Sequence, residues 1–185
     1  MKFILIALIT FLSLKANAQN RNSVWCFGDS AGIDFRIPAS PVPISTGMDT
    51  RGTCTSICDS AGNLLFYAGA GPDGTWTPNG KVYNSNHQLM LNGNDIYAAG
   101  FYDELLIIPK PGSNFLYYIF SINTYVFDPV GTFYSIVDMS GDGGRGSVIE
   151  KNVQIAGDSL CGAMTAVKHG NGRDWWLLIK GYSAL

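Results

Sequence analysis

Apolar and polar positions along this chain alternate in short runs, and one arrangement of them occurs three times. Each copy is an apolar run, a polar turn around a glycine, and a second apolar run that is rich in aromatic residues. The copies span Ser56–Tyr67, Ile107–Phe120 and Ala166–Ile179. Two apolar runs joined by a short turn with glycine are typical of a β-hairpin, so the pattern predicts three hairpins.

Strand-like runs also fill the rest of the chain. No stretch is predicted as an amphipathic helix, because the apolar positions do not follow a sustained period of 3.6 residues. The runs predicted as strands are 24–28, 33–36, 53–59, 63–68, 80–83, 88–91, 104–109, 115–122, 133–138, 148–155, 163–168 and 174–180. The sequence therefore predicts an all-β protein.

The spacing of the three hairpins predicts repeated units. Their turn glycines, Gly62, Gly112 and Gly172, lie 50 and 60 residues apart. A repeat of this length with several strands per unit is typical of the blades of a β-propeller. Twelve strands at four per blade give about three blades, whereas closed propellers have about four to eight. We therefore expect a partial β-propeller, an N-terminal fragment whose remaining blades follow in cis or come from a second copy.

The first residues have the form of a cleavable export signal. Lys2 supplies the positive start, Phe3–Leu14 is apolar, and Ala16–Ala18 fits the small-x-small cleavage rule. The apolar run is shorter than the ~20 residues of a membrane-spanning helix, and no second long apolar run follows. We expect a signal peptide at residues 1–18, a β-propeller-like domain at residues 19–185, and a secreted or cell-surface protein without a transmembrane segment.

The charge of the chain limits the classes of partner that we expect. The chain carries 12 basic and 14 acidic residues, and loss of the signal with Lys2 and Lys15 makes it more acidic. No cluster of basic residues occurs, although a nucleic-acid-binding surface needs one. We expect a surface protein or a polysaccharide as partner, no nucleic acid and no cofactor.

Four cysteines follow the signal, namely Cys26, Cys54, Cys58 and Cys161. On one strand, Cys54 and Cys58 would share a face about 13 Å apart, which is too far for a disulfide between them. Their spacing also fits zinc, but no second ligand pair is near in the sequence. Two interpretations stay open, buried free cysteines or one disulfide between blades, and an oxidising compartment permits the second.

Several segments, in order along the chain, resemble one family of exported proteins. They are Trp25–Phe35, Ser56–Tyr67, Val82–Gly93, Ile108–Gly112, Tyr134–Ser140 and Thr165–Gly172. Together they are similar to the N-terminal propeller-like regions of large secreted bacterial proteins that carry a C-terminal type IX secretion sorting domain, often described as gliding-motility-associated. The resemblance implies export to the cell surface or medium and no established enzymatic activity. The sorting domain is missing here, and Cys26 and Ser30 stand where the family pattern has tyrosine and asparagine.

A serine nucleophile is the main catalytic alternative. Gly28–Gly32 matches the Gly-x-Ser-x-Gly elbow with Ser30 at its centre, and Phe27–Ser30 resembles the opening of secreted Gly-Asp-Ser esterases. Both chemistries need a histidine base and an acid beside the serine. The elbow requires a helix after the turn, but Ile33–Phe35 is predicted as a strand. Neither histidine has the Asp-x-x-His spacing of the esterases, which favours a turn serine.

Asp138 and Asp142 flank a glycine-rich turn whose carboxylate and carbonyl oxygens could hold calcium. The turn lacks the alternating Asp/Asn ladder of an EF-hand loop, which favours a solvated turn without a metal. His87 and His169 lie in the repeated motifs, so we expect structural hydrogen bonds from them rather than catalysis.

Exposed tryptophan would indicate a second alternative, glycan binding. Trp76 lies in a loop rich in proline and glycine, and an exposed tryptophan can stack on a sugar ring. Trp175 and Trp176 are consecutive on a predicted strand, so one should point into the core and the other toward the surface. The favoured interpretation is that these tryptophans have structural roles, packing in the core or filling space in the loop.

The sequence as a whole favours a non-catalytic function. We expect a secreted or cell-surface interaction or scaffold module that forms part of a larger exported protein. The alternatives are a glycan-binding module that uses Trp76 and a secreted serine esterase that uses Ser30.

Overall fold

The computed structural model describes residues 20–50, 52–70, 80–101, 103–124, 129–156 and 160–181. Over these residues the chain forms twelve β-strands, one short 3-10 turn at Asp142–Gly144 and no α-helix. The prediction of an all-β protein is therefore confirmed. The predicted signal peptide lies outside the described residues.

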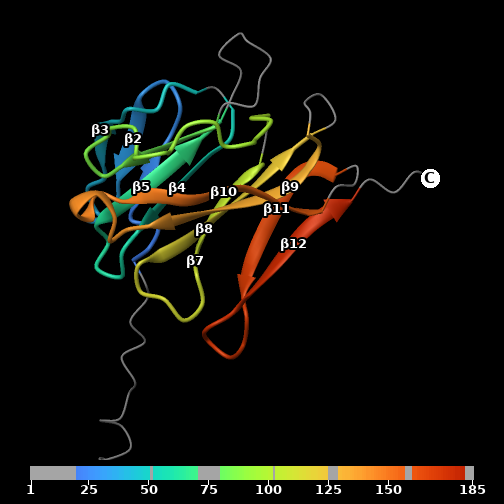
Figure 1. The fold of residues 1–185 in the computed structure, drawn as a ribbon. Helices are drawn as coiled ribbons and strands as arrows, with labels where there is room; N and C mark the ends of the chain where they lie inside the picture. Colours follow the sequence, from blue (N-terminus) through green and yellow to red (C-terminus); the bar gives the residue numbers. More distant parts are fainter. Residues whose placement is uncertain are drawn as a thin grey trace, which may run out of the picture.

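The strands form four antiparallel sheets that follow one another along the chain (Figure 1). The first sheet contains β1 (Val24–Cys26), β2 (Ala31–Asp34) and β3 (Val42–Ser45), and the second contains β4 (Cys54–Cys58), β5 (Leu64–Gly69) and β6 (Lys81–Asn84). The third contains β7 (Leu105–Pro109), β8 (Leu116–Asn123), β9 (Gly131–Asp138) and β10 (Ser147–Ala156). The fourth is the hairpin of β11 (Leu160–Lys168) and β12 (Trp175–Gly181). Within each sheet, strands that are consecutive in sequence are neighbours in space.

All three predicted hairpins are present, as β4–β5, β7–β8 and β11–β12. Their turn glycines have a left-handed backbone, with φ of 94° at Gly62, 78° at Gly112 and 71° at Gly172. Glycine adopts this conformation without the steric cost that a Cβ atom imposes. The hairpins could be predicted because the chemistry of a turn is local to a few residues.

The grouping of strands differs from the expected three four-stranded blades, because only the third of the described sheets has four strands. β3 lies where Pro41 and Pro43 argue against a strand. It is an edge strand of its sheet, where proline is tolerated because no ladder hydrogen bond is lost on the outer side. The run Gln88–Leu91, predicted as a strand, instead makes isolated bridges through Leu89 and Leu91.

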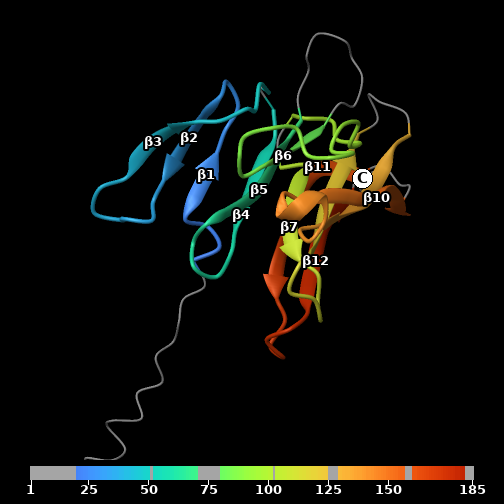
Figure 2. The same ribbon diagram turned by 60° about the vertical axis from the view of Figure 1, so that its left-hand side comes forward.

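The second sheet lies between the first and the third, as Figure 2 shows, and the first strands of successive sheets are in contact. β1 contacts β4, β4 contacts β7, and β7 contacts β11. β4 and β7 begin side by side, since the Leu105 N–H donates to the Thr53 hydroxyl at 3.3 Å. β11 joins the start of β7 through a parallel bridge between Asp103 and Ala163.

The first sheet meets the second with the opposite strand direction. The Cys58 N–H donates to the Arg21 carbonyl at 2.8 Å, and the Ser56 hydroxyl donates to the Val24 carbonyl at 2.8 Å. From Arg21 to Val24 the residue number rises toward and into β1, whereas the partners on β4 fall from Cys58 to Ser56. β1 and β4 are therefore antiparallel, and the first sheet departs from the arrangement of the other three.

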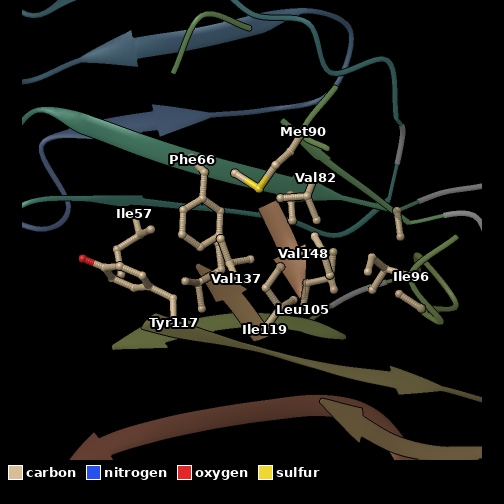
Figure 3. Packing of buried hydrophobic residues seen from close by; sticks show 14 residues of the cluster. Ile57, Phe66, Val82, Met90, Ile96, Leu105, Tyr117, Ile119, Val137 and Val148 are labelled. Carbon is tan, nitrogen blue, oxygen red and sulfur yellow. The ribbon is translucent and has the colours of Figure 1, made fainter. Parts of the chain in front are cut away.

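The main hydrophobic core lies between the second and third sheets (Figure 3). Phe66 of β5 is fully buried there and meets Tyr117 of β8 edge to face, with 5.5 Å between ring centroids. The other buried members of this core are Ile57, Ala68, Ala70, Val82, Met90, Ile96, Ala98, Leu105, Ile107, Ile119, Val137 and Val148. Removing this apolar surface from water is the main favourable term that holds the two sheets together.

A smaller core joins the first sheet to the second. Its buried members are Val24, Cys26, Met48, Cys58, Tyr67 and Tyr83. The rings of Tyr67 and Tyr83 stack with 5.2 Å between centroids. Cys26, Cys54 and Cys58 are free cysteines, and the first and last of them are buried. These three agree with the interpretation that the cysteines are free. The side chain of Cys161 lies outside the described residues.

Replacing Phe66 with alanine should lower the free energy of unfolding by about 3–5 kcal/mol, because it leaves a cavity in the main core. Urea unfolding followed by intrinsic fluorescence measures the change. Phe115→Ala is the matched control, since Phe115 is 50% exposed and its truncation should cost about 0.5 kcal/mol or less. Equal losses in the two variants would contradict this placement of the core.

Burial, and then the neighbouring thiols of Cys58 and Cys54, raise the pKa of Cys26 from 9.0 to about 12. The unfolded chain ionises this thiol at a lower pH than the folded chain, so stability should fall as the pH rises from about 9 toward about 12. Cys26→Ala should flatten this decline in the midpoint of urea unfolding. A decline of the same slope in the variant would show that the Cys26 thiol is not its source.

Candidate functional site

A cleft lies between the first and second sheets, beside the smaller core. Its volume is about 330 Å³, at the lower end of the ~300–1,000 Å³ range of ligand pockets. The lining side chains are the aliphatic groups of Val24, Ile44 and Leu64 and the polar groups of Asp34, Arg36, Asn63, Ser85 and His87. Polar groups from three separate segments of the chain thus converge beside an apolar surface.

An ion pair at the end of β2 supplies the charges of the cleft. Arg36 Nη2 lies 2.6 Å from Asp34 Oδ2, and Arg36 Nε lies 2.9 Å from the same oxygen. The Arg36 backbone N–H also donates to Asp34 Oδ1 at 2.9 Å. These hydrogen bonds, above all those from the guanidinium, hold the pKa of Asp34 below its usual value. The pair is therefore ionised and electrically balanced at neutral pH.

His87 is held at the cleft by a tight turn after β6. Its N–H donates to the Asn84 carbonyl at 3.0 Å, and the Asn84 side-chain oxygen accepts the N–H groups of Asn86 and Gln88. His87 has a left-handed φ of 63°, which is uncommon for a residue with a Cβ atom. Gly47 packs against this turn, and a Cβ atom at that position would collide with the His87 carbonyl oxygen.

The Tyr67 hydroxyl orients the ring of His87. It accepts the Gly47 N–H at 2.8 Å and lies 3.1 Å from His87 Nδ1. Burial raises the pKa of Tyr67 to about 12, so the hydroxyl keeps its proton at neutral pH and can donate to Nδ1 or accept from an Nδ1–H group. His87 Nε2 is then an acceptor or a donor, according to the tautomer.

Ser30 is exposed in the turn between β1 and β2, with φ of 59°. Its N–H donates to the Met48 carbonyl at 2.8 Å, and its carbonyl accepts the Thr46 N–H at 2.9 Å. β2 begins at the next residue, so a strand follows the serine and not the helix of a nucleophile elbow. The hydrogen bonds of the described residues do not join Ser30 to either histidine. Among the described residues, no triad forms around Ser30.

The two carboxylates considered for calcium are engaged in their own turn. Asp138 Oδ1 accepts the N–H and the hydroxyl of Ser140 at 2.8 and 2.6 Å. Asp142 Oδ1 pairs with Arg145 Nη2 at 2.9 Å. Within the described part of the chain, no group of three or more His, Cys, Asp or Glu side chains is arranged to hold a metal ion. Both aspartates are explained as turn residues.

The two consecutive tryptophans lie on opposite faces of β12, as predicted, but Trp175 belongs to neither of the two cores. Trp176 is 61% exposed and Trp175 is half-buried. His169 lies 5.4 Å from Trp176 between ring centroids, and its Nδ1 accepts the Asn171 N–H in the β11–β12 turn. Both histidines therefore make structural hydrogen bonds, as expected. Trp76 lies outside the described residues.

Sequence reasoning missed the cleft because its polar residues are distant along the chain. About 50 positions separate Asp34 from Ser85, and no motif links them. One local signal was present, since Asp34 and Arg36 are two positions apart at a strand end and so share a face. That signal indicates an ion pair and says nothing about the turn that lies opposite it.

Tyr67→Phe should lower the free energy of unfolding by about 1 kcal/mol or more, because the Gly47 N–H loses its acceptor. It should also change the nitrogen chemical shifts of the His87 imidazole, because Nδ1 loses its partner. Tyr83→Phe is the matched control, since it keeps the ring stack and the Tyr67 hydroxyl. Unchanged imidazole shifts in Tyr67→Phe would show that the hydroxyl does not bind Nδ1.

The described ranges contain no helix that is long and apolar enough to cross a membrane.

Comparison with known proteins finds no relative: no family model, no curated protein and no solved structure matches this chain. The resemblance to propeller-like regions of type IX secretion substrates therefore stays a prediction.

Proposed function

We propose that this chain is a non-catalytic interaction or scaffold module, built as a partial β-propeller and forming part of a larger secreted or cell-surface protein. The observation that carries the proposal is an open apolar face on the β11–β12 hairpin. Export is the consequence of the signal peptide predicted at residues 1–18.

The two faces of the β11–β12 hairpin have different environments. Val167 and Trp176 are paired across the strands, so they share a face, and they are 54% and 61% exposed. Leu178 lies on the same face of β12 and is 52% exposed. On the opposite face Met164 is buried, and β11 contacts β7 and β8. Large apolar side chains gathered on one open sheet face are typical of an interaction surface.

The order of the last three sheets supports the propeller interpretation. β4, β7 and β11 are the first strands of their sheets and contact one another in sequence. Inner strands follow one another in this way around a propeller axis, and each blade is an antiparallel meander. In this proposal the first sheet is a modified blade, because β1 runs opposite to β4.

The partner that fits the open face is another β-sheet. Sheets pack face to face through alternate apolar side chains, and the face formed by Val167, Trp176 and Leu178 presents such a row. We propose that further blades in cis or a second copy supply this sheet. Glycan binding through Trp76 and ester hydrolysis by Ser30 stay as alternatives, without added support from the described residues.

The purified chain should either dimerise with rising concentration or bind the apolar dye 1-anilinonaphthalene-8-sulfonate in its native state. Val167→Ser/Trp176→Ser should weaken that association or dye binding by about tenfold or more, because an aromatic anchor is lost. Solution mass and dye fluorescence measure the two effects. Ile149→Ser is the matched control, since Ile149 is 56% exposed on β10, outside this face.

Two outcomes would contradict the proposal. A monomer whose dye binding is the same in wild type and in the double variant would show that the face is not an interaction surface. Labelling by a serine-directed fluorophosphonate that is lost in Ser30→Ala would contradict the non-catalytic assignment.

A further inference from the structure

We propose that the cleft between the first and second sheets binds a small, uncharged, polyhydroxylated ligand, namely a saccharide of one or two rings. The site is separate from the open face of the β11–β12 hairpin, and neither proposal depends on the other. The size, charge, hydrogen-bonding groups and rigidity of the cleft all favour this class of ligand.

The size and surface of the cleft suit a sugar ring. A volume of about 330 Å³ is small for a peptide or a nucleotide among known ligand pockets. Ile44 and Leu64, which are partly buried, provide beside the buried Val24 an aliphatic surface that the C–H face of a pyranose can cover. The polar groups lie beside this surface, so a ligand with one apolar face and a polar edge satisfies both parts.

The charges of the cleft favour a neutral ligand. Apart from the imidazole, the ionisable groups that line it are Asp34 and Arg36, which bind each other. An anionic ligand would be attracted to Arg36 but repelled by the adjacent Asp34. A cationic ligand would be attracted to Asp34 but repelled by Arg36. A hydroxyl group meets neither penalty, because it can accept from the guanidinium and donate to the carboxylate.

The remaining hydrogen-bonding groups call for a partner that both donates and accepts. His87 offers Nε2, which donates or accepts according to the tautomer. Asn63 offers its side-chain carbonyl, since its amide nitrogen already donates to Asp59 Oδ2 at 2.9 Å. Ser85 is exposed, and its hydroxyl can act in either role. Neighbouring hydroxyls of a sugar, each a donor and an acceptor, match this set.

The polar groups are held in place without a ligand. Asp34 fixes Arg36 through its guanidinium, Asp59 fixes Asn63, and the Tyr67 hydroxyl fixes the ring of His87. Binding a ligand to such side chains costs little additional rotamer entropy. The cleft is therefore preorganised for recognition.

Isothermal titration and saturation-transfer NMR of the purified chain test the proposal. The neutral probes are cellobiose, xylobiose, maltose and mannobiose, and digalacturonate is the anionic probe. At least one neutral probe should bind, and Arg36→Met should weaken it by about tenfold or more because a charged donor is lost. Ser85→Ala removes an exposed hydroxyl and should weaken binding severalfold. Arg145→Met is the matched control, since it breaks a similar ion pair, with Asp142, outside the cleft.

Weaker binding confined to the Arg36 and Ser85 variants would support the site. Binding of the anionic probe alone would overturn the neutral class of ligand. An equal loss in Arg145→Met, or no binding of any probe, would overturn the site itself. If Arg36→Met lowers the midpoint of thermal unfolding, the test of the site is the affinity of Ser85→Ala for the probe relative to that of the wild type.

Discussion

Both faces of β5 are buried, and the stacking of the sheets depends on this constraint. Phe66 and Tyr67 are consecutive, so they point to opposite sides of the second sheet, and both are fully buried. Phe66 lies in the core shared with the third sheet, and Tyr67 lies in the core shared with the first. A sheet with a large ring on each face cannot leave either face in water without a loss of burial free energy. The second sheet therefore requires a neighbour on both sides.

The same constraint positions the candidate site. The ring of Tyr67 is committed to the smaller core, which places its hydroxyl within hydrogen-bond distance of the Gly47 N–H and His87 Nδ1. A buried phenol needs such partners, because an unsatisfied polar group in the interior costs free energy. One side chain thus couples the packing of the first two sheets to the geometry of the cleft between them. In this protein the stability of the sheet interface and the shape of the site are not independent.

The first and fourth sheets both carry aromatic side chains at the surface. Trp176 is 61% exposed on the fourth sheet. Trp25 of the first sheet is 48% exposed and lies 5.0 Å from Phe35 between ring centroids. The second and third sheets bury their large side chains against neighbours, and the first and fourth sheets have no such neighbour on one side among the described residues. This contrast is the physical basis for the proposal of an interaction module.

The three hairpins are predictable from the local sequence pattern alone. Gly62, Gly112 and Gly172 each occupy a left-handed turn position, and the apolar runs around them pair as expected. β3 was not predicted, because Pro43 argues against a strand until its edge position is known. The run Gln88–Leu91 alternates like a strand, yet it forms bridges in a turn region that presents His87.

The sequence by itself determined the all-β class, the three hairpins and the opposite orientations of Trp175 and Trp176. These features depend on residues a few positions apart, through turn conformation and the two-residue period of a strand. Only the tertiary structure decided that β1 runs antiparallel to β4 and that the Asp34–Arg36 pair shares a cleft with His87. Those contacts depend on which apolar faces pack together, and that choice is made by the burial of the whole core rather than by any local run of residues.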